Sequence, residues 1–577
     1  MWLLATSCLE MRINVKNKKV LLVAINAKYI HSNLAVYCLK KYAEKYSDYI
    51  EIAEYTINQY TDYIFKDIYK RRPDVVLFSC YIWNIDYVSC IIRNLRKVME
   101  SAEIWVGGPE VSYSAEDFLK EYTEVNGVMV GEGEKIFLKM MKRWIESVGE
   151  LNNINGIVYR ENNNIITNPH ECIMDLSDLP FPYDNLNEFK NKIIYYESSR
   201  GCPYSCSYCL SSVDKKLRFR NLDLVKKELK IFINNNIQQV KFVDRTFNCN
   251  KSHAMEIWQF IKDNDNGVTN FHFEISADLI GENELELFKS MRPGLIQLEI
   301  GVQTTNSKTI REINRTMNLD KLKYVVEKIN SFGNIHQHLD LIAGLPYEDY
   351  NSFIKSFNDV YAMHPEQLQL GFLKVLNGAE MQKSTEKYGL VYTSDPPYEV
   401  LSTKWLSFDD IIKLKNIEEM VELFHNSRQF TNTLSWLENK YESPFEMFEE
   451  IGRYYEAHKL HEVKHNRIQN YEIIYEYIKS NYEDYEIFEQ LIILDIYLRE
   501  NIKSRPLFLK EQDKESLREY YHKYKQAGKM IHIEEFSINV SEWFENKKII
   551  KEKQIVLFDY NNKNPINLWC ECKVITA

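Results

Sequence analysis

The sequence lacks the features of two large classes of protein. Its 577 residues contain no apolar run that approaches the ~18 residues of a membrane span. Basic residues are not in excess either, because 72 Lys and Arg stand against 83 Asp and Glu, which gives a net charge of −11. Nonspecific binding of nucleic acid requires a basic surface, although a local basic patch is compatible with this balance. We therefore expect neither a membrane span nor a nucleic-acid partner.

A disulfide framework is also missing. The eleven cysteines are scattered, and residues 1–8 have neither the basic start nor the apolar length of a secretory signal. Disulfides are rare in reducing compartments, where free thiols remain available as metal ligands. These absences predict a cytoplasmic protein. No internal repeat or low-complexity segment stands out.

What the N-terminal part does contain is an alternation of short apolar segments and helical patterns. This alternation is typical of βαβ units and a parallel sheet, whose ligands bind beyond the carboxyl ends of the strands. Glycines in the loops at those ends could equally serve tight turns alone. We predict a doubly wound, Rossmann-like domain over residues 12–147. The expected strands are residues 20–25, 50–55, 75–81, 104–106 and 128–130.

A second series of strands and helices follows a polar connection over residues 148–190. Pro180 and Pro182 end this connection, since proline cannot continue a helix or a central strand. Six strands are too few for a closed eight-stranded barrel, so we predict an open, partial (β/α)6 barrel over residues 191–402. The expected strands are residues 193–198, 239–243, 271–276, 295–300, 338–342 and 368–372.

Residues 403–577 have a different character. Ser407 and Asp410 have the spacing of a capping box, and amphipathic, tyrosine-rich helical patterns follow before a few strand-like segments close the chain. We predict a mostly helical α+β accessory domain that covers the mouth of the barrel and sets selectivity. The whole chain is then of the α/β class.

Three cysteines carry the strongest chemical signal. Cys202, Cys206 and Cys209 lie within eight residues, directly after the first predicted barrel strand. Three thiolates on one loop can hold three irons of a [4Fe–4S] cluster, which usually takes four cysteines, and this would leave the fourth iron open to a ligand. The alternatives are a zinc site or three unrelated thiols. Zinc prefers four ligands, and neither a His nor a second cysteine pair is close in the sequence.

With this loop in place, the chain resembles radical SAM enzymes that carry a cobalamin-binding domain. The resemblance covers roughly residues 18–400 and implies a [4Fe–4S] cluster, S-adenosyl-L-methionine and cobalamin as cofactors, with an electron donor such as flavodoxin or ferredoxin. The C-terminal third resembles a region of unassigned function in one subgroup. Besides the cysteine loop, the similar segments are residues 107–110, 131–134, 242–248, 273–277, 298–303 and 340–346.

The resemblance also implies roles for individual side chains. Tyr208 would lie beside the adenine, and Arg245 would suit a carboxylate. Each position could instead be an ordinary packed or hydrogen-bonded residue. The expected catalytic residues are Asp244, Arg245 and Glu299. The expected cofactor contacts are Tyr208, Glu197, Asn248, Gln303 and Gly344 in the barrel and Asn26, His31, Ser79, Trp83, Gly107, Gly108 and Gly131 in the N-terminal domain.

One departure from the family pattern concerns cobalt. Cobalamin domains that bind cobalt through histidine carry Asp-x-His-x-x-Gly, whereas His31 has neither this Asp nor this Gly beside it. We expect His31 to form hydrogen bonds within its loop rather than to bind cobalt. The missing motif is still compatible with cobalamin binding in which no histidine coordinates the cobalt.

Three functions are compatible with the resemblance. The one we favour is a cobalamin-dependent methyltransferase that acts on an unactivated carbon of a small molecule or peptide. The second is a radical SAM enzyme with a relict cobalamin domain that catalyses rearrangement, cyclisation or oxidation. The third is a non-catalytic iron–sulfur sensor or scaffold, against which the open cluster corner and the polar strand ends argue.

Overall fold

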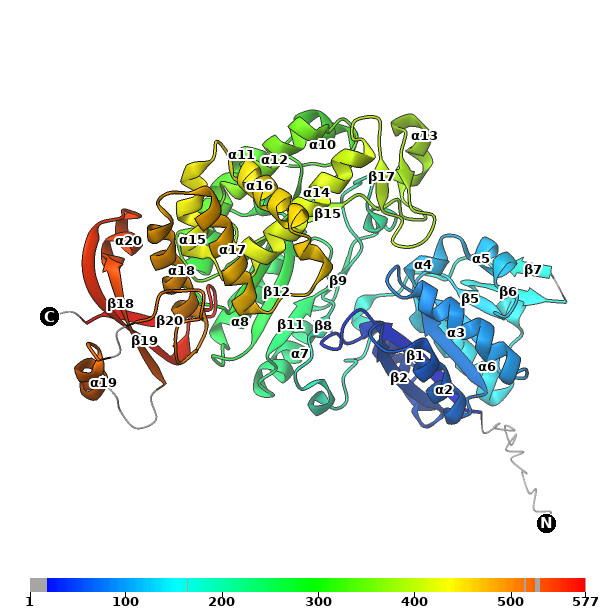
Figure 1. Ribbon diagram of the computed structural model, residues 1–577. Coiled ribbons are helices and arrows are strands. Elements are labelled where there is room, and N and C mark those ends of the chain that lie inside the picture. Colours follow the sequence, from blue (N-terminus) through cyan, green and yellow to red (C-terminus); the bar gives the residue numbers. More distant parts are fainter. Residues whose placement is uncertain (1–17, 163, 513–514, 525–529, 576–577) are drawn as a thin grey trace, which may run out of the picture.

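The computed structural model describes residues 18–575, except 163, 513–514 and 525–529 (Figure 1). Residues 1–8, in which we sought a secretory signal, lie outside the described part. Figure 1 shows an N-terminal sheet domain, a central sheet with helices around it, and a helical region that ends in a small sheet. Among the described residues, no helix is both long and apolar enough to cross a bilayer.

The N-terminal domain is built on a seven-stranded sheet in the order β2-β1-β3-β4-β5-β6-β7. Its first five strands are parallel and are covered on both faces, by two separate apolar cores. The doubly wound parallel fold is thereby confirmed. The strands are β1 (Val20–Asn26), β2 (Ile50–Thr56), β3 (Val75–Ser79), β4 (Glu103–Gly107), β5 (Gly127–Met129), β6 (Ile157–Glu161) and β7 (Asn164–Thr167). The helices are α1 (Leu34–Tyr42), α2 (Thr61–Arg71), α3 (Ile85–Val98), α4 (Pro109–Ser112), α5 (Ala115–Glu121) and α6 (Gly133–Glu146).

The hairpin β6–β7 lies within the expected connection over residues 148–190, where the sequence has a short hairpin-like piece over residues 156–160 and 164–167. Strand β6 pairs antiparallel with β5, and its Val158 and Tyr159 are buried against the sheet. This pairing with β5 joins the hairpin to the N-terminal sheet, which therefore extends into the region that we assigned to the connection.

The central domain holds six parallel strands in the order β15-β14-β13-β12-β11-β8. This open arrangement is the predicted partial barrel. The strands are β8 (Ile194–Tyr196), β11 (Gln239–Phe242), β12 (Asn270–Ile275), β13 (Ile296–Gln303), β14 (His336–Ala343) and β15 (Gln367–Phe372). The helices between them are α7 (Leu222–Asn234), α8 (Lys251–Asp263), α9 (Glu282–Lys289), α10 (Ser307–Glu312), α11 (Leu319–Asn330) and α12 (Tyr350–Tyr361).

Buried and more exposed residues alternate along the fourth barrel strand, β13. Strand β13 buries every second side chain, among them Leu298 and Ile300, against the surrounding helices. The intervening positions carry polar groups, and Glu299 lies in register with Glu274 on β12 and His338 on β14. The concave face of the barrel is therefore polar, which is unusual beside the apolar interior of a closed barrel.

The C-terminal region is helical and closes with the three-stranded sheet β18-β19-β20. Ser407 and Asp410 form the predicted capping box of α14. The region packs against the outside of the barrel, where Phe445 meets Tyr350 and Phe357 of α12. The elements named here are α14 (Phe408–Met420), α15 (Thr431–Leu437), α16 (Pro444–Ala457), α17 (Arg467–Asn481), α18 (Tyr485–Arg499), α19 (Arg518–Tyr524), α20 (Val540–Asn546), β18 (Ile531–Ile538), β19 (Lys551–Lys563) and β20 (Cys570–Val574).

Candidate functional site

The cysteine loop leaves the barrel directly after its first strand. Cys202 and Cys206 are buried and Cys209 is half-buried. Gly201 precedes the loop with φ +97°, and a Cβ atom there would lie 2.7 Å from the backbone oxygen of Lys216. Only glycine fits this position, because it needs both a left-handed conformation and a close backbone approach.

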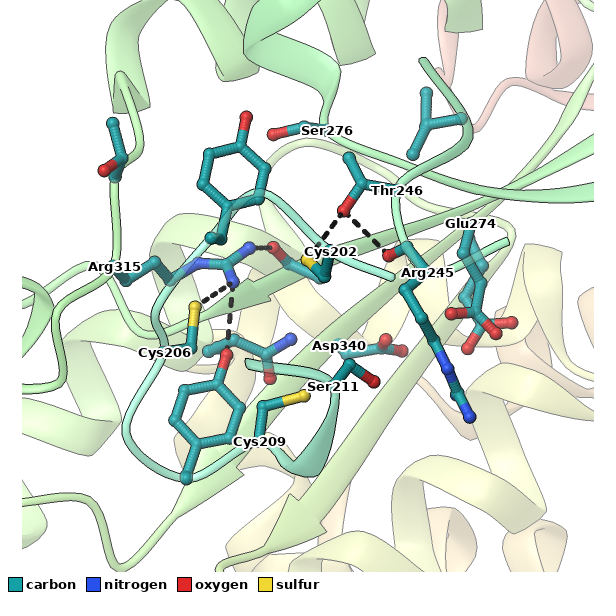
Figure 2. Close-up of a pocket in the computed structure, with 17 residues that line it drawn as sticks. Cys202, Cys206, Cys209, Ser211, Arg245, Thr246, Glu274, Ser276, Arg315 and Asp340 are labelled. Atoms are coloured by element: carbon teal, nitrogen blue, oxygen red, sulfur yellow. Dashed lines mark hydrogen bonds between the residues drawn. The ribbon is translucent and has the colours of Figure 1, made fainter. Parts of the chain in front are cut away.

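The three cysteines line one cavity together with residues from the carboxyl ends of β11 to β14 (Figure 2). This is the edge at which barrel folds place their chemistry. Seven of the predicted site residues meet here: Cys202, Cys206, Cys209, Tyr208, Arg245, Glu299 and Gln303. The other lining residues are Tyr204, Ser211, Thr246, Glu274, Ile275, Ser276, Gly301, Arg315, Thr316 and Asp340.

The set of possible ligands at the cavity bears on the choice between a cluster and a zinc ion. A structural zinc ion takes four protein ligands, usually cysteine and histidine. Among the described lining residues, Cys202, Cys206 and Cys209 are the cysteines and no histidine accompanies them. Three thiolates are the set that binds a [4Fe–4S] cluster and leaves one iron open to another ligand.

Glu299 is the best-connected carboxylate in the cavity. It accepts from Lys241 at 2.9 Å and lies 3.0 Å from Nε2 of His272. Burial acts to raise the pKa of Glu299, but the hydrogen bond from His272 and the charge of Lys241 outweigh it and hold this pKa well below its usual range. Glu299 is thus an anion, and Lys241 and His272 within the barrel stabilise its charge.

Glu274, beside it, is in the opposite state. Burial, with the charge of Glu299, raises the pKa of Glu274 to about 7, against only partial relief from Arg245. The neighbouring carboxyl of Asp340 meets His338 at 3.0 Å, and burial raises its pKa as well. The cavity therefore holds one fixed anion and one carboxyl poised between its neutral and charged forms.

Several groups at the cavity await a partner. Gln303 ends β13 with φ +71°, a strained conformation for this residue type, and its buried Oε1 has no hydrogen-bond partner among the described residues. Nε of Arg315 is likewise buried without an acceptor. Such groups are rare in native structures unless a ligand completes them. The cavity thus offers one acceptor, Oε1 of Gln303, and one donor, Nε of Arg315, for a ligand that carries both charges.

Four predicted barrel residues do not line this cavity. Asp244 is buried and accepts from Ser198 N at 2.9 Å, Ser198 Oγ at 2.7 Å and Ser199 Oγ at 2.6 Å. Burial raises its pKa to about 6. These contacts fix the backbone that leads into the cysteine loop, and the expected catalytic role of Asp244 stays a prediction.

The remaining three also hold backbone in place. Asn248 exchanges hydrogen bonds with the backbone of Ser276 at 2.8 and 2.9 Å. Gly344 has φ +91°, and a Cβ there would come within 2.7 Å of a methyl group of Val400. Glu197 pairs with Arg200 at 2.7 Å. The polarity of Asn248 and Glu197 was visible in the sequence, but the partners of their side chains were not.

Arg200 also joins the two domains. Its Nη2 lies 2.8 Å from Glu134 in the loop that begins α6 of the N-terminal domain. Arg218 binds Glu132 of the same loop at 2.5 Å. The N-terminal loop over residues 131–134 is thereby tied to the residue two places before Cys202.

The carboxyl edge of the N-terminal sheet faces the barrel at β8. His31 Nδ1 lies 2.7 Å from the hydroxyl of Tyr195, and Asn26 donates to the backbone oxygen of His31 at 3.2 Å. Burial lowers the pKa of His31. His31 is therefore hydrogen-bonded, as expected, but its side-chain partner lies in the barrel and not within its own loop.

This edge carries apolar side chains that the protein itself does not cover. Trp83 is 41% exposed and stacks on Tyr81 with ring centroids 4.3 Å apart, and Tyr29 and Tyr113 are 71% and 43% exposed. Gly131 has open space around it. Exposed aromatic groups on one edge are suited to a broad, flat ligand.

Two other predicted positions at this edge shape its backbone. Gly108 has φ +113°, and a Cβ there would lie 2.4 Å from the oxygen of Cys80. Gly107 packs beside Met129, and Ser79 is buried with its carbonyl bound by Asn84. These contacts make the loop after β4 tight and glycine-dependent.

Sequence reasoning missed Glu274 and Arg315. Glu274 stands within a segment whose similarity we noted, and its inward position follows from the alternation along β12. Arg315 comes twelve residues after the end of β13, where no local pattern connects it with the cysteines. Cys249, the cysteine that we did not connect with the loop, is near enough for the charge of Cys202 to act on it, although burial is the main reason that its pKa rises to about 11.

Comparison with protein families divides the chain in the same way as the structure. Residues 20–140 match the B12 binding domain, residues 196–360 match the radical SAM superfamily, and residues 386–558 match a family described as a protein of unknown function, DUF4080. The first two matches coincide with the N-terminal sheet domain and the barrel. The predicted resemblance is thereby confirmed.

Curated relatives are distant and match in part. A methyltransferase of Pyrococcus horikoshii, itself named as uncharacterized, is 26% identical over 49% of this chain and 63% of its own length. The cobalamin-dependent radical SAM methyltransferase TokK of Streptomyces tokunonensis is 22% identical over 55% of this chain and 50% of its own. The chain thus spans about half to two thirds of the length of these relatives.

Solved structures share the fold. The cobalamin-dependent S-adenosylmethionine radical enzyme OxsB, with aqua-cobalamin and S-adenosylmethionine bound, has a TM-score of 0.55 at 16% identity, over 83% of this chain and 78% of its own. The radical S-adenosylmethionine methyltransferase TsrM of Kitasatospora setae, with cobalamin and a [4Fe–4S] cluster, has a TM-score of 0.54 at 16% identity, over 65% of this chain and 76% of its own. At this identity the likeness establishes the shared architecture.

Proposed function

We propose that this chain, a radical SAM protein with a B12-binding domain and a C-terminal DUF4080 region, is a cobalamin-dependent methyltransferase. The observation that carries the proposal is the pairing of two sites in one molecule. A three-cysteine loop opens onto a polar cavity in the barrel, and the uncovered aromatic edge of the N-terminal sheet adjoins the same barrel. The methyltransferase names among the relatives agree with this pairing.

The chain's own residues fit the cofactors. Bound together, a [4Fe–4S] cluster, S-adenosylmethionine and cobalamin supply one-electron reduction, radical formation and a transferable methyl group. Cys202, Cys206 and Cys209 would hold three irons of the cluster. Arg245 and the unpartnered oxygen of Gln303 offer a donor and an acceptor for the amino-acid end of S-adenosylmethionine.

The N-terminal edge would hold the corrin ring through contact rather than through a histidine. Trp83 and Tyr29 offer apolar surface, and Gly131 leaves room for a close approach. The charged bridges between residues 131–134 and the barrel would keep the two cofactors at a fixed separation and exclude water between them. Exclusion of water protects reactive intermediates from side reactions.

The substrate is a small molecule or peptide with an unactivated carbon as acceptor. We propose a flavodoxin or ferredoxin as the electron donor and the cytoplasm as the location. Free thiols throughout the described chain are consistent with a reducing compartment. The polar concave face of the barrel favours a substrate that forms hydrogen bonds.

Anaerobic reconstitution tests the proposal directly. The protein would be supplied with iron, sulfide and hydroxocobalamin, desalted, and assayed for iron, cobalt and cleavage of S-adenosylmethionine. We expect about four irons and about one corrinoid bound per protein chain, and transfer of label from methyl-labelled S-adenosylmethionine to a substrate. Iron without cobalt, and deoxyadenosine without a methylated product, would instead indicate a radical enzyme with a relict cobalamin domain. A retained cluster that never cleaves S-adenosylmethionine would indicate a sensor or scaffold.

A further inference from the structure

Arg315 reaches into the cysteine site from a distant part of the chain. It follows α10 (Ser307–Glu312) in the connection between β13 and α11. Its Nη1 donates to the hydroxyl of Tyr208 at 3.1 Å and lies 3.9 Å from Sγ of Cys206. Its Nη2 donates to the backbone oxygen of Gly301 at the β13 bulge. Figure 2 shows the guanidinium beside Cys206, whereas Arg245 extends away from the cysteines.

This guanidinium has no carboxylate partner among the residues that the structure describes. The groups whose charges act on it are Tyr208 and Cys206. Arg200, a few residues before the loop, shows the usual arrangement, because it pairs with both Glu134 and Glu197. Arg315 is half-buried and its Nε is fully buried. A cation held in such a site without an anion is costly, so Arg315 needs negative charge from the site itself.

We propose that Arg315 is a positioning residue and a counter-charge for the iron–sulfur cluster. It fixes the side chains of Cys206 and Tyr208 together, and it makes the cluster easier to reduce. The inference rests on the proposed function only in requiring that a cluster binds. It assigns to one arginine a role that neither the cysteine motif nor the cavity lining by itself indicates.

Simple electrostatics gives the direction of the effect. Each electron that enters makes the cluster more negative, and a nearby buried cation stabilises the reduced form more than the oxidised form. Net charge and hydrogen bonds to sulfur are among the factors that set cluster potentials. Gly301 contributes by leaving room, since a Cβ there would lie 3.5 Å from Nη2 of Arg315 and closer still to Gln303.

A purely structural role is the alternative. Arg315 would then only tie the end of β13 to the cysteine loop through Gly301 and Tyr208. Neutral substitution would loosen the loop and reduce iron content. It would not change the potential of the clusters that remain. The two roles therefore differ in a property that can be measured on a cluster-loaded protein without any turnover.

The test is an EPR-monitored redox titration of the full-length, reconstituted protein without substrate. The variants are Arg315→Gln, Arg315→Met and Arg315→Lys, with the exposed Arg311→Gln on α10 as the matched control. For the two neutral variants we expect at least a tenfold lower ratio of reduced to oxidised cluster at a fixed solution potential. For a one-electron couple this corresponds to a potential lower by about 59 mV. Arg315→Lys and Arg311→Gln should stay within about threefold of the wild type, which is less than half of that shift.

Four outcomes would overturn the inference. One is an unchanged potential in the neutral variants, and another is a Lys variant as low as the Gln variant, because charge would then not be the cause. If neither neutral variant retains iron, the test depends on Arg315→Lys. A tenfold lower ratio of reduced to oxidised cluster in this variant would then overturn the inference. A wild type that shows normal potentials but no methyl transfer would remove the proposed function and leave this inference standing. A wild type without a cluster would remove both.

Discussion

The N-terminal sheet and the barrel sheet differ in how far their two faces are buried. In the N-terminal sheet, strand β1 buries all seven of its residues, because helices cover both faces. In the barrel, β13 alternates between buried apolar residues and polar residues that face the concave side. The first sheet can therefore bind ligands only with the loops at its edge, whereas the second can also use side chains along its strands.

This difference indicates which substitutions should impair ligand binding in each of the two domains. The edge of the N-terminal sheet depends on backbone shape, on glycines and on exposed aromatic groups. The barrel depends on individual thiols and charges. Four substitutions, from the largest expected effect to the smallest, should separate the two modes.

Cys206→Ala should abolish the barrel site and spare the edge. Loss of one of three thiolates removes an iron ligand, so we expect loss of cluster iron and of S-adenosylmethionine cleavage. Cobalamin retention should stay near the wild-type level, because no residue of the N-terminal edge is altered. Iron and cobalt analysis of the same reconstituted sample provides the measurement. Parallel loss of cobalt would show that the two sites are not separable in this way.

Gly108→Ala should impair the N-terminal edge and leave the cysteine site of the barrel intact. A Cβ at this position would lie 2.4 Å from a backbone oxygen, in a left-handed conformation with φ +113°. We expect a loss of about 3 kcal/mol in the free energy of unfolding, from strain and overpacking together. Cobalt retention should fall and iron retention should not. Urea unfolding with metal analysis tests this, and Gly149→Ala, at a glycine with open space and φ +100°, controls for the strain alone.

Glu274→Gln should change how stability depends on pH. The pKa of Glu274 is raised from 4.5 to about 7 by burial, so the folded state binds more protons than the unfolded state between these values. The free energy of unfolding of the wild type therefore falls as pH rises through this window, by at most about 3 kcal/mol. The Gln variant should lose this part of the slope.

Urea unfolding at pH 5 and pH 8 measures that slope. Glu286→Gln, at an exposed position on α9, is the control and should keep the wild-type difference between the two conditions. A Glu274→Gln protein with an undiminished slope would mean that this carboxyl ionises freely in the folded protein.

Glu134→Gln should have the smallest effect. It weakens the bridge to Arg200 at 2.8 Å, but Arg200 keeps Glu197 at 2.7 Å. We expect a loss of about 1 kcal/mol in stability, the size of one ordinary hydrogen bond, because the Gln side chain can still accept from Arg200. Differential scanning calorimetry can detect it as a lower transition temperature, with the exposed Glu100→Gln as the control. An unchanged transition would show that the bridge adds nothing to domain docking.

Much of the architecture followed from local patterns. The strands of both sheets, the open six-stranded barrel and the capping box at Ser407 each depend on residues close together in sequence, where periodicity and spacing are informative. The cysteine loop was found for the same reason, because its three ligands occupy one short segment.

What local patterns could not give has the opposite cause. Asp244 and Asn248 were predicted as site residues, but their hydrogen-bond partners Ser198 and Ser276 are distant in sequence and could not be predicted. Arg315 was missed because it meets Cys206 across more than one hundred residues. We also expected residues 403–577 to cover the barrel mouth. The cavity is instead lined by residues 202–340, and the C-terminal helices pack on the outer side of the barrel.

The apolar cores show which parts of the molecule depend on one another for their packing. One continuous core runs from Tyr183, just before the barrel, to Cys570 near the C-terminus, whereas the N-terminal sheet has two cores of its own. Tyr37 of α1 nevertheless packs against Tyr183 and Phe189 of the large core, so loss of the N-terminal domain would uncover both aromatic rings. Removing the C-terminal region would expose the outer face of the barrel, with which it shares this core. We therefore expect the barrel and the C-terminal region to unfold together, as a single domain does.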